Sequence, residues 1–209
     1  MANAKDYKKE FKDLYLPKNK PMIIDVPEIQ FVAIEGKGNP NEENGEYQKA
    51  LAVLYGIQYT IKMSKMGPNQ LEGYFDYVVP PLEGFWWLDK GDTFSSKSKY
   101  NWLSVIRLPE FVTGDIFKWA CSEVSLKKGI ETSNAKYLKI KEGLCVQCMH
   151  IGSYDNEPET LKMMEDFIVE NGLANDVNDK RRHHEIYLND PRKTDKDKLK
   201  TVLRIPVKR

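Results

Sequence analysis

The same order of predicted strands and helices occurs twice along the chain. In the first half, a predicted strand at 29–36 precedes a predicted helix at about 45–65, and in the second half a strand at 144–151 precedes a helix at about 159–171. Two further strand-like runs close each half: YFDYVVPP and YNWLSVIRLPEF in the first, HHEIYLNDP and LKTVLRIPV in the second. An internal duplication constrains the fold strongly, because both copies have to bury the same faces.

The closing runs of the two halves align residue by residue. WLSVIRLP lies over LKTVLRIP, which places Arg107 over Arg204. FDYVVPP lies over EIYLNDP, which places Phe75 over Glu185. A symmetric core gives no reason for a ring in one copy and a carboxylate in the other, whereas an asymmetric ligand does.

The repeated unit predicts an α+β fold. Two strand-helix-strand-strand repeats suggest an antiparallel sheet backed by helices, with a pseudo-twofold axis between the repeats and a cleft where they meet. The length of 209 residues suits one large domain or two small fused units. We expect a single domain over 1–209, with repeat one at about 22–112, a linking helix at about 113–129 and repeat two at about 137–209.

Charge and composition exclude several partners. The chain has 32 basic and 31 acidic side chains, so its net charge of +1 gives no general attraction to nucleic acid or anionic lipid. The first sixteen residues are charged throughout and show no signal peptide, and no apolar run approaches the length of a membrane span. Three cysteines cannot all pair. We therefore expect a cytoplasmic protein that binds neither nucleic acid nor membrane.

The HHEIYLNDP run reads as a strand with two unlike faces. Ile186 and Leu188 alternate with Glu185 and Tyr187, and a period of two is typical of a half-buried strand. Glu185 therefore faces either water or a site that uses a carboxylate, and Tyr187 shares its face.

Aromatic side chains are numerous, with four Trp, eleven Tyr and eight Phe. Plain core packing accounts for any one of them as well as ligand contact does. A planar ligand needs rings to stack on, and both helices and strands offer candidates. The candidates are Tyr55, Trp86, Trp87, Trp102 and Trp119. Trp86 and Trp87 are adjacent, so in a regular strand they point to opposite faces.

Several segments resemble the stand-alone GyrI-like small-molecule-binding proteins. They are DYKKEFKDLYLPKNKPMIIDVPEIQFVAIEGKGNPN, FKWA, MHIGSYD and HHEIYLNDP, and together they span nearly the whole chain. The resemblance implies the two-copy SOUL or GyrI-like fold, which is also the effector domain of multidrug-sensing transcription activators. In such domains a glutamate on a late strand lies in an aromatic-walled cavity and meets planar, often cationic drugs. Glu185 matches that glutamate.

The resemblance also implies chemistry. One subfamily of GyrI-like proteins hydrolyses the cyclopropyl ring of DNA-alkylating natural products of the yatakemycin and CC-1065 type, within an aromatic cage. In that reading Glu185 positions or deprotonates a water, and Tyr187 orients Glu185 or donates to a ligand carbonyl. His150, in MHIGSYD, matches a histidine that the family often carries. The reaction needs no metal and no cofactor.

Two alternatives stay open. The chain could be a binding module without chemistry, acting as a drug sink or as an inhibitor of a protein target. Haem binding is the second alternative, although no axial-ligand motif is evident. A zinc site is not expected, because Cys145 and Cys148 would point to opposite faces of a strand and Cys121 is remote. No helix-turn-helix precedes the predicted repeats, which is a departure from the transcription activators and argues against direct DNA regulation.

Overall fold

The structure divides into two compact units that are interleaved along the chain. It is a computed structural model that describes residues 4–67, 70–89 and 97–209. Unit 1 consists of Met1–Asp6, Ile29–Pro80 and Trp87–Ile140, and unit 2 of Tyr7–Glu28, Pro81–Trp86 and Lys141–Arg209. The unit boundaries do not follow those of the predicted repeats, and the single domain over 1–209 stays a prediction.

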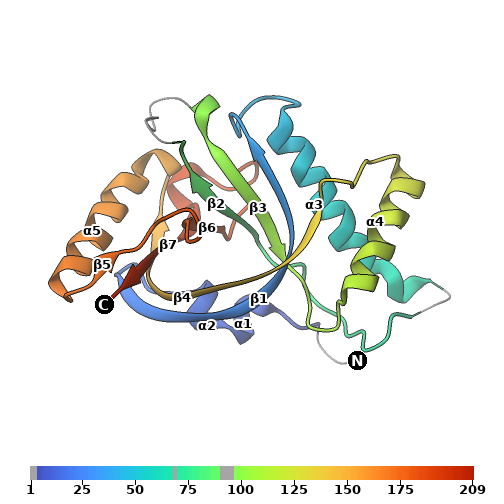
Figure 1. Ribbon diagram of the computed structural model, residues 1–209, viewed down its shortest axis with the longest axis horizontal. Coiled ribbons are helices and arrows are strands. Elements are labelled where there is room, and N and C mark those ends of the chain that lie inside the picture. The colour runs from blue at the N-terminus through green and yellow to red at the C-terminus, as the bar shows by residue number, and fades with distance from the viewer. Residues whose placement is uncertain (1–3, 68–69, 90–96) are drawn as a thin grey trace. The chain divides into compact units, whose positions relative to one another are not determined.

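The order of helices and strands repeats as predicted (Figure 1). After the short helices α1 (Tyr7–Glu10) and α2 (Lys12–Tyr15), the elements are β1 (Met22–Lys37), α3 (Glu46–Met63), β2 (Leu82–Trp87), β3 (Asn101–Arg107), α4 (Gly114–Lys128), β4 (Lys136–Ile151), α5 (Glu157–Glu170), β5 (Ala174–Asn175), β6 (His183–Tyr187) and β7 (Lys200–Lys208). Strand, helix, strand, strand thus occurs twice, with α4 between the copies, and the second copy has the additional two-residue strand β5 after α5. The α+β class with antiparallel pairing is confirmed. No helix within the described residues is long and apolar enough to cross a membrane.

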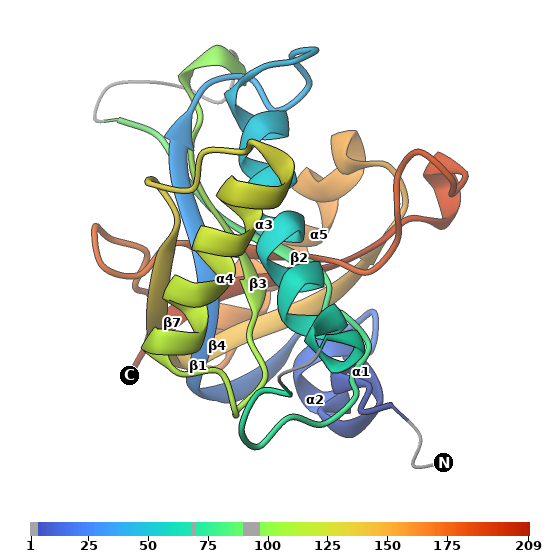
Figure 2. The same ribbon diagram turned by 90° about the vertical axis from the view of Figure 1, so that its right-hand side faces the viewer.

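Unit 1 is built on an antiparallel pair and two helices. β1 and β3 pair from Phe31 opposite Arg107 to Lys37 opposite Asn101. α3 and α4 lie side by side in both views (Figures 1 and 2), and Gly56 of α3 lies close to Val124 of α4.

Unit 2 is built around β7, which pairs antiparallel with β4, β5 and β6. α5 packs its apolar side onto these strands. The shared cluster consists of Val146, Cys148, Met164, Ile168, Leu203, Ile205 and Val207. Buried apolar surface of this kind is the main stabilising contribution in a domain of this size, so β6 is held on a rigid support.

The strand pairing confirms one of the two alignments between the halves. Arg107 stands opposite Phe31 in one copy, and Arg204 stands opposite Gln147 in the other. The pair Glu35–Leu103 corresponds in the same way to Ile151–Lys200. WLSVIRLP and LKTVLRIP are therefore equivalent strands.

The second alignment is wrong. FDYVVPP is not a strand: within it, only Tyr77 makes an isolated bridge, with Lys5. The Tyr77 ring is buried in the core of unit 1, where its hydroxyl donates to the carbonyl of Gln58 at 3.2 Å, and the two prolines that follow have no amide hydrogens for a ladder. Phe75 therefore has no strand position equivalent to that of Glu185. The strand that pairs with β6 is β2, and its Gly84 stands opposite Glu185.

Candidate functional site

β6 has the two unlike faces that its sequence predicts. His184 and Ile186 are buried, whereas His183, Glu185 and Tyr187 are partly exposed on the other face. The alternation that places Glu185 and Tyr187 together is thus confirmed. Solvent reaches this face, because 16% of the Glu185 side chain is exposed.

The Glu185 carboxylate is held by its neighbours on the strand. The Tyr187 hydroxyl donates to Oε2 at 2.7 Å, and Nε2 of His183 lies 3.2 Å from Oε1. Trp86, on β2, in turn donates its indole N–H to the Tyr187 oxygen at 2.8 Å. These contacts fix the direction of the carboxylate, as a site that uses it in binding or catalysis requires.

Gly84 leaves room for this arrangement. It stands opposite Glu185 in the β2–β6 pair. A Cβ at this position would lie 2.8 Å from Nε1 of Trp86 and 3.3 Å from the Tyr187 hydroxyl oxygen. A glycine is therefore needed here for close approach of the two side chains.

A second carboxyl group, Glu157, lies near Glu185. Glu157 begins α5, is 9% exposed, and its Oε1 atom is buried without a hydrogen-bond partner. Burial, followed by the charges of Glu185 and Asp155, raises the pKa of Glu157 to about 9. Glu157 therefore carries a proton at neutral pH.

Tyr154 lies beside Tyr187. Its ring packs edge-on against that of Tyr187, with 5.9 Å between the centroids. Burial and the charges of Glu157, Glu185 and Asp190 raise the pKa of Tyr154 to about 12. The phenol thus stays protonated.

The sequence did not single out Glu157, Tyr154 or His183. GSYDNEP reads as a polar loop, and an acidic residue beside a proline is ordinary at the start of a helix. The structure starts α5 at Glu157, two residues before the predicted helix. Tyr154 occurs in MHIGSYD, one of the segments that resemble the family. This resemblance was the one sequence feature that could have pointed to Tyr154.

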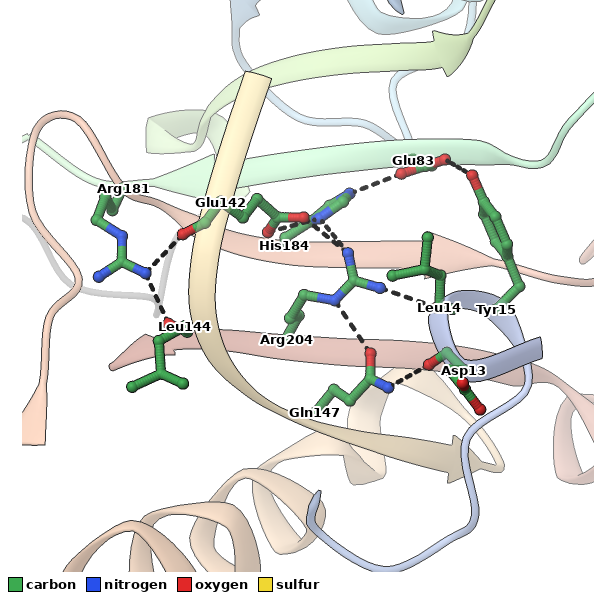
Figure 3. A network of polar contacts seen from close by, with 10 residues as sticks. All are labelled: Asp13, Leu14, Tyr15, Glu83, Glu142, Leu144, Gln147, Arg181, His184 and Arg204. Atoms are coloured by element: carbon green, nitrogen blue, oxygen red, sulfur yellow. Dashed lines mark hydrogen bonds and ion pairs between the residues drawn. The ribbon is translucent and has the colours of Figure 1, made fainter. Parts of the chain in front are cut away.

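The buried face of β6 is anchored by an ion network (Figure 3). His184, fully buried, lies between Glu142, with Oε2 3.0 Å from Nδ1, and Glu83, with Oε2 3.0 Å from Nε2. Arg204 on β7 donates to Glu142 at 2.7 Å. Burial alone would lower the pKa of His184, but the two carboxylates raise it above its usual value.

The same network reaches the segment before β1. Arg204 donates to the carbonyl of Leu14 at 2.8 Å, Gln147 donates to the carbonyl of Asp13 at 2.5 Å, and the Tyr15 hydroxyl donates to Glu83 at 3.3 Å (Figure 3). These bonds connect α2 to the strands that carry the candidate site. They satisfy buried polar groups, which would otherwise be costly.

The other predicted aromatic residues belong to unit 1. Trp102 is 1% exposed and packs edge-on against Tyr47, with 5.1 Å between the centroids, so it is part of that core. Tyr55, Trp87 and Trp119 are half-buried, and the Tyr55 ring lies 6.4 Å from that of Tyr59. Their part in ligand binding stays a prediction.

His150 has partners for both ring nitrogens inside unit 2. Nδ1 lies 2.9 Å from Oγ1 of Thr160, and Nε2 lies 3.0 Å from the Ser153 carbonyl. These contacts tie the end of β4 to α5 and the turn before it. No group of three or more His, Cys, Asp or Glu side chains in the described part of the chain is arranged to hold a metal ion.

The chain is similar to proteins of one family over nearly its full length. Residues 19–208 match the GyrI-like small molecule binding domain. An uncharacterized conserved protein from Listeria innocua is 48% identical, with a TM-score of 0.94 over 98% of this chain and 100% of that chain. A hydrolase from Listeria innocua is also 48% identical, with a TM-score of 0.90 over 98% and 100%.

More distant likeness is confined to the fold. The EcmrR C-terminal domain is 12% identical, with a TM-score of 0.56 over 91% of this chain and 98% of that domain. The chain matches no curated protein. Because the family match extends from β1 to β7 and includes both β6 and α5, this chain belongs to the GyrI-like family of small-molecule-binding domains.

Proposed function

We propose that this protein binds planar aromatic xenobiotics and hydrolyses the cyclopropyl ring of DNA-alkylating cyclopropanoids of the yatakemycin and CC-1065 type, which would protect a cell from them. The observation that carries this proposal is the Glu185 carboxylate, held by Tyr187 and His183 on a face that solvent reaches. The similarity to a hydrolase from Listeria innocua supports it.

The reaction requires a base that removes a proton from the attacking water. In these compounds a cyclopropane is conjugated to a dienone. The water oxygen bonds to a cyclopropyl carbon, one ring C–C bond breaks, and its electron pair makes the dienone an aromatic phenolate. Glu185 would take the proton of that water, because each carboxylate oxygen has a second lone pair beyond its present contact.

Ligand stacking would come first from Trp86, which lies beside Tyr187 on the Glu185 face. Tyr154 adds a ring against Tyr187. Aromatic side chains bury large flat surfaces at little entropic cost, which suits a planar ligand.

The test compares the wild type with Glu185→Gln, which keeps the size of the side chain but cannot act as a base. We expect the variant to bind a CC-1065-type cyclopropanoid, measured by calorimetry, while hydrolysis falls by roughly two to four orders of magnitude, the usual contribution of a general base. Mass spectrometry of the product should show a water adduct that forms with turnover in the wild type.

The opposite outcome points to a different function. If the wild type returns intact ligand in stoichiometric amount, the protein is a non-catalytic drug-binding module related to the multidrug-sensing effector domains. If Glu185→Gln hydrolyses within a few-fold of the wild type at saturating substrate, Glu185 is not the base.

A further inference from the structure

Opening a cyclopropyl dienone puts negative charge on the carbonyl oxygen, so the reaction also needs a proton donor there. The donors nearest Glu185 are already in use. Tyr187 gives its single O–H to Glu185, and Trp86 gives its single N–H to Tyr187. A donor for the ligand has to come from another side chain.

Glu157 has an oxygen free for that bond. Its Oε1 atom is buried and has no hydrogen-bond partner. Most buried polar atoms in folded proteins are paired, so an orphan carboxyl oxygen calls for an explanation. A ligand atom that pairs with it when bound provides one.

The charges around Glu157 keep a proton on it. Burial is the first cause that opposes its ionisation, and the negative charges of Glu185, on β6, and Asp155, in the turn before α5, add to it. Tyr154 is neutral, Asp190 adds a further negative charge near Tyr154, and His183 contacts Oε1 of Glu185. The first turn of α5 favours an anion, but burial and the carboxylates outweigh it.

We propose that Glu157 donates a proton to the carbonyl oxygen of the ligand while Glu185 removes one from the attacking water. This inference rests on the proposed function. The bond from water to carbon forms and the cyclopropyl C–C bond breaks. The carbonyl becomes a phenol, Glu157 becomes a carboxylate and Glu185 a carboxylic acid. Transfer of one proton from Glu185 back to Glu157, through solvent, restores the starting state.

The pair thus holds one proton and one negative charge before and after the step. Two close carboxyl groups favour that state over double ionisation. Glu157 also suits the acceptor better than Tyr154 does. A phenol product has an ordinary pKa of about 10. An acid with a pKa of about 9 is nearer to it than one with a pKa of about 12.

The kinetic test is Glu157→Gln, with Glu159→Gln as the matched control on the exposed side of the same helix turn. The probe is a CC-1065-type cyclopropanoid. We expect hydrolysis to fall by roughly two to four orders of magnitude in Glu157→Gln and to stay within two-fold in Glu159→Gln. The wild-type rate should fall above about pH 9, and this alkaline limb should vanish in Glu157→Gln. A Glu157→Gln rate within a few-fold of the wild type, while Glu185→Gln is inactive, would overturn the proposal.

A second measurement does not need turnover. Infrared spectroscopy of the wild type should show the carbonyl stretch of a protonated carboxyl group at neutral pH, lost as the pH rises past about 9. The band should be missing in Glu157→Gln and present in Glu159→Gln. Absence of the band from the wild type overturns the inference even where hydrolysis is found. Its presence without hydrolysis by the wild type would reject the proposed reaction, and with it the donor role, while leaving the protonated Glu157 in place.

Discussion

Gly84 shows how much the candidate site depends on a missing side chain. It stands opposite Glu185, and the space above it is filled by the indole of Trp86 and the hydroxyl of Tyr187. A Cβ at Gly84 would lie 2.8 Å from Nε1 of Trp86, closer than real Cβ contacts. The hydrogen bond between Trp86 and Tyr187 therefore exists because this position has no Cβ.

We predict that Gly84→Ala displaces the Trp86 indole. The free energy of unfolding should fall by about 1–3 kcal/mol, which is the usual cost of overpacking a site. The indole N–H resonance of Trp86 should shift, because its hydrogen bond to Tyr187 is broken. Hydrolysis should decrease, because Tyr187 would lose the hydrogen bond that fixes its position and would then orient the Glu185 carboxylate less well. Denaturant unfolding and proton NMR measure these effects.

Gly114→Ala is the control for that variant, because no atom outside the neighbouring stretch of chain lies within 4 Å of the place that its Cβ would take. Its stability should stay within about 0.5 kcal/mol of the wild type. An unshifted Trp86 resonance in Gly84→Ala would show that the strands move apart to accept the methyl group.

The sequence could predict Glu185 and Tyr187 but not Glu157. Alternation along β6 puts Glu185 and Tyr187 on one face whatever the rest of the fold does. Nothing local distinguishes a buried glutamate at the first turn of α5 from the exposed ones common there. Burial of Glu157 follows from how α5 packs in unit 2, and that is tertiary information.

The elements differ in how far local signals determine them. α4 was predicted within a residue at each end, because Thr113 caps it with a hydrogen bond to the Ile116 amide and Gly129 ends it with a φ of +64°. β2 was misplaced, because FDYVVPP has strand-like composition but its tyrosine is buried in unit 1. Strand pairing depends on partners distant in sequence, so composition alone is a weaker guide to it.

The strands of unit 2 depend on the ion network of Glu83, Glu142, His184 and Arg204. Glu83 and Glu142 flank the imidazole of His184, and their charges raise its pKa. Glu142 contacts both basic side chains, at 3.0 Å from His184 and 2.7 Å from Arg204. Removing one member of such a network leaves a buried charge without compensation.

We predict that Glu142→Gln lowers the free energy of unfolding by about 3–5 kcal/mol at pH 7, the usual effect of breaking a buried ion pair. The amide keeps the size of the side chain but leaves Glu83 as the one carboxylate beside His184 and the guanidinium of Arg204 without its ion pair. Chemical denaturation measures the loss. Glu165→Gln, on the exposed side of α5, should change stability by less than about 0.5 kcal/mol. Equal losses in the two variants would mean that the network contributes little.

At the scale of the molecule, three buried groups give stability a dependence on pH. Burial opposes ionisation of Glu142, but His184 and Arg204 lower its pKa from 4.5 to about 2, so its stabilising effect is present above pH 4.5 and is lost as the pH falls toward 2. The pKa of His184 is raised above 6.5, so its effect is present below pH 6.5 and is lost as the pH rises through the folded value. Glu142 thus makes stability fall as the pH becomes acidic, and His184 makes it fall as the pH becomes alkaline.

Of these three groups, Glu157 affects stability over the widest pH range. Its pKa rises from 4.5 to about 9 on folding, so its stabilising effect is fully present below pH 4.5 and is lost as the pH rises to about 9. Across that interval the unfolded chain releases a proton that the folded chain keeps, which costs about 1.4 kcal/mol of stability per pH unit. We predict that the contribution of Glu157 to this slope disappears in Glu157→Gln, which leaves the fall that His184 causes above pH 6.5, and that both contributions remain in Glu159→Gln. Unfolding by denaturant at several pH values between 5 and 8 measures it for all three proteins. Parallel curves for the wild type and Glu157→Gln would mean that Glu157 ionises as an ordinary glutamate does, and the pair with Glu185 would then carry two charges at neutral pH.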